Sequence, residues 1–208
     1  GAKSKAKHEE LPQYSGYELL KVAKPTYNLE GLNQLYVKDD THYSAVQVKV
    51  ANVIGLGYDV IDSADTRAQK EKISEDEEKK HELFRRLQTW KFQVFAKLDD
   101  LNEDDAFLDT LEKVFTDYET NGNGYIEVGR TANGVIGYVG HIPSHTMRVR
   151  QARDGFVQIA GGKTTFFRNF GDTTTEDPIG NDNNPNEIIH FKKYNPNDLY
   201  YGMPDIIP

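Results

Sequence analysis

The stretch FLDTLEKVFTDYETNGNGYIEVGR, residues 107–130, changes its hydrophobic period halfway along. In the first half the apolar residues recur at i, i+1, i+4, i+7, i+8 and i+11, which is one face of an amphipathic helix. These residues are Phe107, Leu108, Leu111, Val114, Phe115 and Tyr118. After Asn121 the period becomes two, and the Gly and Asn residues between the halves are typical of a turn. We therefore predict a helix that leads directly into a strand.

Strands are predicted for the rest of the chain. Two runs with alternating apolar residues, 125–131 and 135–141, flank Asn133-Gly134, which favours a type I′ hairpin turn. A second hairpin is predicted around Gly161-Gly162, with strands over 156–160 and 163–170, and a further strand is predicted over 147–150. The polar loop 171–187 contains acids but no Lys or Arg, and a last strand is predicted over 187–193.

Helices are predicted for the first 120 residues. Asn28 is a candidate N-cap for a helix that carries Leu29 and Leu32, and a second helix is predicted after Thr41, although Val46, Val48 and Val50 also fit a strand. A short strand over 58–61, a charged segment over about 62–82 and a helix with an apolar stripe from Leu83 to Leu98 come next. The capping-box pair Ser74 and Glu77 marks the start of that helix.

This order of elements predicts an α+β fold, in which N-terminal helices are followed by antiparallel strands and hairpins. Residues 1–27 are predicted to be a flexible N-terminal tail, and residues 28–208 one α+β domain with a charged insertion at about 62–82. The chain starts without Met and has no signal-peptide pattern and no apolar run long enough for a membrane span.

Composition limits the classes of function. The chain has no cysteine, which excludes disulfides, thiolate metal sites and cysteine nucleophiles. Its formal net charge of -8 argues against tight binding of nucleic-acid phosphates, which depends on clustered Lys and Arg. We found no nucleophile elbow, zinc-protease helix, P-loop or dinucleotide-binding fingerprint. The prediction is a protein that is not an enzyme and uses no cofactor.

One segment is similar to a calcium-binding EF-hand loop. Glu119, Asn121 and Asn123 fall at loop positions 1, 3 and 5, and Gly124 falls at position 6. Position 12, which should supply a bidentate carboxylate, is Arg130. We therefore interpret the segment as a turn between a helix and a strand, with calcium binding as a remote alternative and no metal site predicted.

Two further groups of polar residues could have functional roles. His141 and His145 are four residues apart, but Pro143 between them removes a shared helical face, so we interpret them as loop histidines. Arg148, Arg150 and Arg153 form a basic cluster together with Lys163 and Arg168. They could contact phosphates, or they could pair with the acidic loop 171–187 of this chain or of a neighbouring subunit.

Three stretches of the sequence resemble portal proteins of tailed bacteriophages, in the HK97-like portal family. The first runs from Leu35-Tyr36 to Gly57-Tyr58, the second from Asn121 to Val128 and on to His141-Ile142-Pro143, and the third from Glu187 to Phe191 and on to Tyr201-Gly202-Met203-Pro204. The motif residues are Gly122, Asn123, Gly124, Tyr125, Glu127, His141, Pro143, Glu187, His190, Tyr201, Gly202 and Pro204.

The resemblance implies a structural subunit of a ring, commonly of twelve identical subunits, at the portal vertex of the virion. Such a ring contacts terminase, scaffold or capsid proteins and tail adaptors, lets double-stranded DNA pass transiently, contacts no membrane, and assembles in the host cytoplasm. This chain would be the wing-like part, cut before the stem, clip and crown. The alternative is another head–tail or baseplate adaptor protein of a phage.

Overall fold

The computed structural model describes residues 18, 20–59, 61, 63–72, 77–180 and 184–207. Its helices are α1 (Leu29–Lys38), α2 (Asp40–Val53), α3 (Ala64–Lys72), α4 (Glu77–Asp99) and α5 (Phe107–Asn121), and a short 3-10 helix, η1, spans Ser144–Thr146. The strands are β1 (Asn123–Arg130), β2 (Ile136–Ile142), β3 (Met147–Val149), β4 (Phe156–Ala160), β5 (Lys163–Asn169) and β6 (Glu187–Lys192). The α+β prediction is confirmed.

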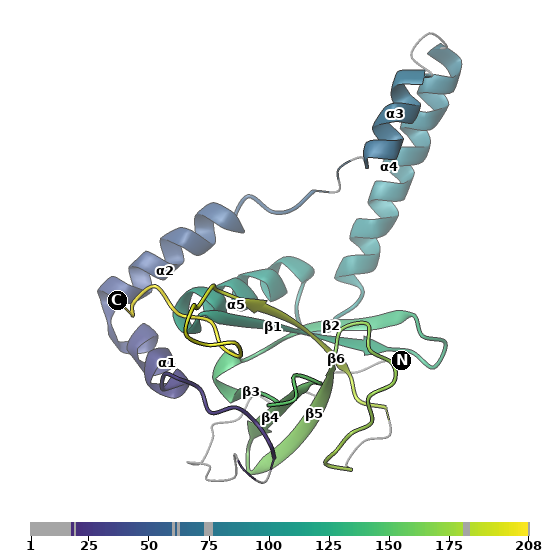
Figure 1. Cartoon of the computed structure of the whole chain (residues 1–208). Coiled ribbons are helices and arrows are strands. Elements are labelled where there is room, and N and C mark those ends of the chain that lie inside the picture. Colours follow the sequence, from purple (N-terminus) through teal and green to yellow (C-terminus); the bar gives the residue numbers. More distant parts are fainter. Residues whose placement is uncertain are drawn as a thin grey trace.

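The strands form one sheet in the order β2-β1-β6-β5-β4-β3, and α5 lies along β1 on one side of it (Figure 1). Val114 of α5 packs on Ile126 and Val128 of β1, so the amphipathic face predicted for residues 107–118 is the face that covers the sheet. The predicted passage from helix to strand occurs at Gly122, which has a φ of 74° and ends α5 in the left-handed region.

The main core lies between the sheet, α1 and the segment around Tyr201. It contains Tyr125, Phe167 and Tyr201 together with Leu29 and Leu32, the apolar residues of α1. Asn28 caps α1 as predicted, since its side chain accepts a hydrogen bond from the Gly31 N–H at 3.0 Å. Asp39 caps α2, which starts slightly before the position that we predicted.

Residues 20–27 differ from the flexible tail predicted for residues 1–27. Val22 is buried and forms a bridge with Arg150, and the Ala23 N–H donates to the Val149 carbonyl at 2.8 Å. The segment therefore extends the sheet beside β3. The sequence does not reveal this strand-like segment, because Val22 and Ala23 lie between Lys21 and Lys24 and two apolar residues are too few to show a hydrophobic period.

The prediction that all strands are antiparallel is wrong for one pair. β6 runs antiparallel to β1 but parallel to β5, with Arg168 opposite Glu187 and Asn169 opposite Ile188. A parallel pair requires a long connection, and the polar loop after β5 supplies it. β6 is thereby inserted in the middle of the sheet between two hairpins.

The two predicted hairpins use different turns. Gly161 and Gly162 both have positive φ, as a type I′ turn requires. At Asn133-Gly134 only Gly134 has positive φ, and the Gly134 N–H bonds to the Thr131 carbonyl at 2.9 Å. This is a three-residue loop with a left-handed glycine rather than the predicted type I′ turn, and it accompanies a register shift at Gly129/Arg130.

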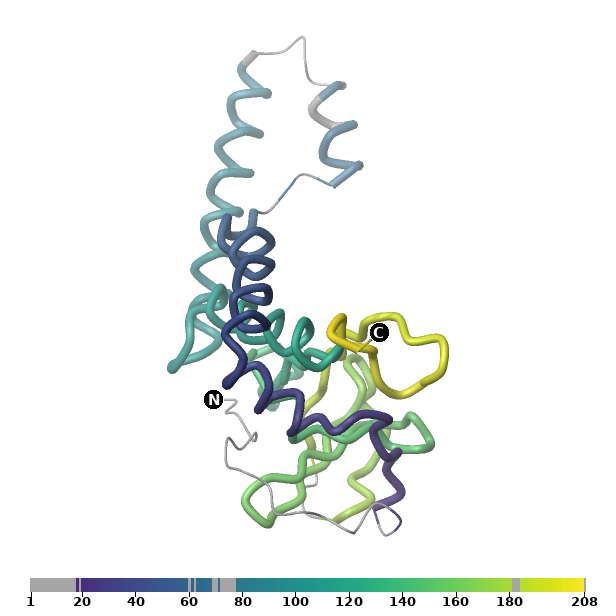
Figure 2. Tube along the Cα trace, turned by 90° about the vertical axis from the view of Figure 1, so that its left-hand side faces the viewer, coloured from purple at the N-terminus to yellow at the C-terminus, as the bar shows by residue number. Residues whose placement is uncertain are grey.

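The described part of the charged insertion is helical over residues 64–72 and 77–82. α3 and α4 form an arm that projects from the rest of the molecule in both views of the backbone (Figures 1 and 2). At the base of the arm the Tyr58 ring contacts Phe95 and Phe107, with ring centroids 5.4 and 5.2 Å apart. Tyr58, Asp59 and Ile61 are not in a strand, contrary to our prediction for 58–61, and Ser74 of the predicted capping box lies outside the described residues. Within the described ranges no helix combines the length and the apolar character needed to cross a membrane.

Candidate functional site

The motif residues of the second and third stretches meet at one place, which we call the glycine junction: Gly122, Asn123, His190 and Gly202. The Gly122 carbonyl accepts a hydrogen bond from the Lys193 N–H at 2.9 Å. Asn123 Oδ1 lies 2.8 Å from the Gly202 N–H and 3.1 Å from His190 Nε2. One asparagine side chain therefore joins the start of β1 to β6 and to the Tyr201-Gly202 segment.

The two glycines of the junction approach each other too closely for side chains. A Cβ built on Gly122 would lie 2.7 Å from the Gly202 carbonyl carbon, and one built on Gly202 would lie 2.0 Å from the Gly122 oxygen. Gly124 is similarly restricted, since its Cβ would lie 2.6 Å from the Val114 oxygen of α5. Glycine is required here by the close approach of backbone to backbone.

Tyr201 fixes the other side of the junction. Its hydroxyl donates to the Ala23 carbonyl at 2.8 Å and accepts from the Val149 N–H at 3.0 Å, so it bridges the N-terminal segment and β3. Pro204 is also buried. The Tyr201–Pro204 element is thus part of the core of this domain.

Aromatic rings stack beneath the junction. The rings of Tyr125 and His190 are 4.4 Å apart at an interplanar angle of 11°, and Phe156 meets His190 edge to face. Burial raises the pKa of Tyr125 well above its usual value. Burial, helped by the positive charge of Lys192, lowers the pKa of His190 to about 3. His190 is therefore neutral in the folded protein.

We expect His190 to make the fold acid-sensitive between about pH 6.5 and pH 3. Below pH 6.5 the unfolded chain binds a proton at His190 that the folded chain does not, so the free energy of unfolding should fall by up to about 1.4 kcal/mol per pH unit. Urea unfolding of the wild type and of His190→Gln at pH 7, 6 and 5 measures this. The variant should be less stable at pH 7 and should lose less on acidification; parallel pH curves would contradict the assignment.

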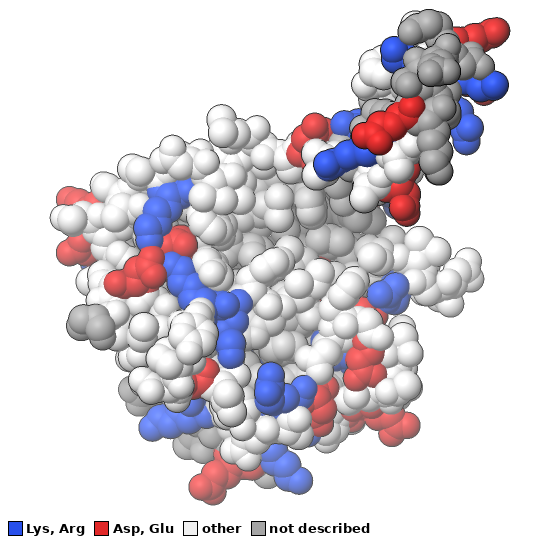
Figure 3. All heavy atoms as spheres, turned by 45° about the horizontal axis from the view of Figure 1, so that its top comes forward, with Lys and Arg blue, Asp and Glu red and all other residues white. Residues whose placement is uncertain are grey.

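A network of ion pairs lies at the end of α5. Glu119 Oε2 is 2.7 Å from Lys49 Nζ of α2 and 2.8 Å from Lys193 Nζ. Asp205 pairs with the same two lysines, at 2.9 Å from Lys193. Charged side chains of both signs lie side by side on this face of the molecule (Figure 3). The network ties α2, α5 and the segment after Pro204 to the end of β6.

The EF-hand-like residues are used within this structure. Glu119 is neutralised by the two lysines, Asn121 Nδ2 donates to Ser144 Oγ at 2.6 Å, and Asn123 Nδ2 donates to the Asn121 carbonyl at 2.8 Å. Glu127 is fully buried and accepts from Asn186 Nδ2 at 2.7 Å. Among the residues that the structure describes, no group of three or more His, Cys, Asp or Glu side chains is placed to hold a metal ion.

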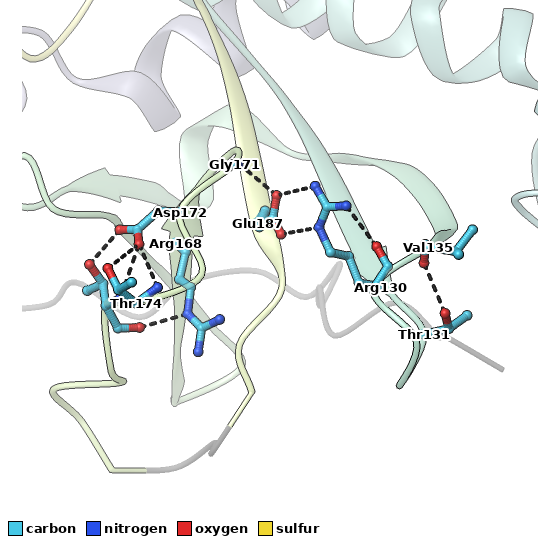
Figure 4. Close-up of polar contacts among 10 residues, drawn as sticks. Arg130, Thr131, Val135, Arg168, Gly171, Asp172, Thr174 and Glu187 are labelled. Atoms are coloured by element: carbon cyan, nitrogen blue, oxygen red, sulfur yellow. Dashed lines mark hydrogen bonds and ion pairs between the residues drawn. The ribbon is translucent and has the colours of Figure 1, made fainter.

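A second buried carboxylate, Glu187, connects the acidic loop to the sheet (Figure 4). Its oxygens accept from Arg130 Nε at 2.5 Å, from Arg130 Nη2 at 3.1 Å and from the Gly171 N–H at 2.8 Å. Burial by itself would raise the pKa of Glu187, but the hydrogen bonds from Arg130 and Gly171 outweigh it, and the pKa lies below its usual value. This pair holds the start of β6 against the end of β1.

The rest of the acidic loop is held near β5. Arg168 Nε donates to the Thr175 carbonyl at 2.7 Å, and Asp172 accepts hydrogen bonds from Thr174 and Thr175 (Figure 4). The side-chain hydrogen bond from Thr175 is the main reason that the pKa of Asp172 is lowered. One residue of the predicted basic cluster thus contacts this loop in the same chain, through a backbone carbonyl.

The arginines predicted as interface or phosphate contacts differ in exposure. Arg148 is buried and donates to the His145 and Met147 carbonyls at 2.7 and 2.8 Å. Arg150 is buried and pairs with Asp154 at 2.7 Å. Only Arg153 of these three is exposed. A surface role for Arg153 stays a prediction, whereas the other two stabilise the loop around it.

The histidines are also placed by this chain. His141 lies in β2 rather than in a loop, and its Nε2 is 2.8 Å from Asp117 Oδ2 of α5. The same oxygen accepts from the Ser144 N–H at 2.7 Å, directly after Pro143. His145 lies in η1, where burial lowers its pKa. Asp117 was not singled out in the sequence, because no motif links it to residues more than twenty positions away.

No protein-family model matches the chain, and no curated protein matches it. Among solved structures, a chain from the neck of a native GTA particle computed with C12 symmetry is 16% identical, with a TM-score of 0.57 over 90% of this chain and 42% of that chain. A chain from the neck of an empty GTA particle computed with C6 symmetry is 24% identical over 52% of this chain and 28% of that chain, with a TM-score of 0.41.

A chain from the virion of a native gene transfer agent particle is 23% identical over 53% of this chain and 29% of that chain, with a TM-score of 0.42. This chain therefore spans less than half the length of each of the three. The likeness with a TM-score of 0.57 shows a shared fold over most of this chain.

Proposed function

We propose that this chain is the wing-like part of a structural subunit in a portal ring at the vertex of a phage-like capsid. The observation that carries the proposal is the fold that 90% of the chain shares with a chain from the neck of a GTA particle. The sequence motifs support it independently, because residues far apart in the chain are brought together at the glycine junction.

The geometry suits a load-bearing part without catalytic chemistry. Glu119 is paired with lysines and Glu187 with Arg130, and burial lowers the pKa of His190 to about 3, outside the range of a general base at neutral pH. The ion pairs and the glycine junction connect elements that are distant in the sequence. Such connections resist shear between α2, α5 and the sheet.

In this proposal the subunit acts by assembly. Its partners are identical subunits, terminase, scaffold or capsid proteins and tail adaptors, and double-stranded DNA passes through the channel of the complete ring. The net charge of -8 suits a subunit that should not hold DNA tightly. Its place is the virion, after assembly in the host cytoplasm.

A second candidate is another head–tail adaptor of a phage-like particle, because the structural likeness is to a chain from a neck and covers less than half of that chain. A portal subunit and an adaptor differ in the segment that comes after the shared domain. Long helices that line a channel are expected there in a portal and not in an adaptor.

Electron microscopy of the full-length protein tests the proposal. We expect closed rings with a central channel, because a contact between two different surfaces builds a ring when its rotation closes. Purification in high and low salt controls for non-specific aggregation. Particles that remain monomeric at all protein concentrations would count against both portal and adaptor functions.

A further inference from the structure

The α4 helix of the arm has an unusual surface between Leu83 and Leu98. All charged residues in this interval are basic: Arg85, Arg86, Lys91 and Lys97. Within the described part of the chain, Lys91 pairs with Asp59 at 3.6 Å, and no ion pair involves Arg86 or Lys97. A chain with a net charge of -8 therefore concentrates positive charge on residues 83–98 of one projecting helix.

Three of these residues share one face. Arg86, Trp90 and Lys97 are spaced i, i+4 and i+11, and we call them the α4 stripe. Trp90 is 51% exposed. Arg86 and Trp90 of the stripe line a hollow of about 760 Å³, together with Leu83 and Leu87, and Glu82 is its one acid.

The neighbouring helix α3 covers this face only in part, since Thr66 is its one described residue that lines the hollow. In its sequence, ADTRAQKEK, the only apolar residues are alanines. An exposed Trp beside half-buried leucines and unpaired cations is typical of a surface that binds a partner. We expect the partner to present carboxylates around an apolar surface.

The chain itself contains a surface of that chemistry. A groove of about 430 Å³ between α2 and α5 is lined by Asp105, Asp109, Glu112 and Asp117, with Lys113 as its one lysine. Tyr36 and Val50 supply apolar lining. Within the described residues no ion pair or hydrogen bond involves the carboxylates of Asp109 and Glu112.

Within one chain, α3 and most of α4 project away from α2 and α5 (Figures 1 and 2). We infer that the α4 stripe of one copy docks into the α2–α5 groove of a second copy. The contact joins two different surfaces and is therefore heterologous, which is the kind that builds a ring when its rotation closes. The inference rests on the proposed function in so far as a ring supplies the second copy.

Charge reversal on each surface tests the contact. The stripe variant is Arg86→Glu/Lys97→Glu, and the groove variant is Asp109→Lys/Glu112→Lys. In the first both surfaces are negative, and in the second both are positive. Each variant alone should self-associate at least about tenfold more weakly than the wild type in sedimentation velocity, because like charges then face each other.

An equimolar mixture of the two variants should regain association, because each chain then offers the other a surface of opposite charge. The control is Lys24→Glu/Lys163→Glu, which changes the net charge as the stripe variant does at exposed positions elsewhere. It should associate as the wild type does. Thermal unfolding of every variant verifies that it folds.

Several results would overturn the inference. The wild-type chain could stay monomeric up to about 1 mM. The single variants could associate as strongly as the wild type does, or the mixture of the two variants could fail to regain association. A stripe variant that only loses affinity for a duplex oligonucleotide would assign the stripe to DNA instead. If both variants of the full-length protein form rings as the wild type does, this contact is refuted and the proposed function stands. If the mixture regains association but the full-length protein forms no rings, the contact stands and the proposed function is refuted.

Discussion

Replacing Gly122 by alanine should lower the free energy of unfolding by about 3 kcal/mol or more. Two costs add. The residue has a φ of 74°, which costs an L-residue about 1–2 kcal/mol. The new Cβ would also lie 2.7 Å from the Gly202 carbonyl carbon, which is backbone and cannot rotate away. Relief of this contact would separate β1 from the Tyr201-Gly202 segment.

Gly134→Ala is a matched control for this prediction. Gly134 has a φ of 77°, but a Cβ there would meet no atom within 4 Å. Its cost should therefore be about 1 kcal/mol, from backbone strain alone. Urea unfolding followed by circular dichroism measures both variants. Equal losses in the two would mean that the approach of Gly122 to Gly202 contributes nothing.

Local elements were predictable where the sequence has a strong period or a specific turn residue. The α5–β1 passage, the Gly161-Gly162 hairpin and the Asn28 cap were all predicted from neighbouring residues. The position of β6 was not, because its pairing with β5 depends on a loop that has no pattern of its own. Val22 and Ala23 were missed for the same reason, since a short apolar step becomes a bridge only when β3 lies beside it.

The candidate site was predictable as a set of residues and not as a set of contacts. The resemblance singled out Asn123, His190 and Gly202, but their spacing along the chain does not indicate that one side chain bonds to both of the others. The ion pairs were harder to predict from the sequence. Arg130 was considered only as a misfit in an EF-hand-like loop, and its pairing with Glu187 depends on a strand register that the sequence does not encode locally.

Arg130→Met should lower the free energy of unfolding at pH 7 by about 2–3 kcal/mol. The substitution leaves the buried Glu187 carboxylate with only the Gly171 N–H. Loss of one partner of a fully buried pair costs about 3–5 kcal/mol, and the Arg130 side chain is 28% exposed, so the smaller value is expected. Arg153→Met removes an exposed arginine and should change the stability by less than about 0.5 kcal/mol.

The pH dependence separates the ion pair from simple packing. The pKa of Glu187 is below its usual value in the wild type, so the stability from the pair is present at neutral pH and is lost as the pH falls. In Arg130→Met, burial without the guanidinium should raise that pKa, so the carboxyl binds a proton early on acidification. The stability difference between wild type and variant should therefore shrink from pH 7 to pH 4, while the contribution of His190 is common to both and cancels. A difference that stays constant over this range would assign the loss to packing of the arginine side chain, including its approach to the Phe170 ring.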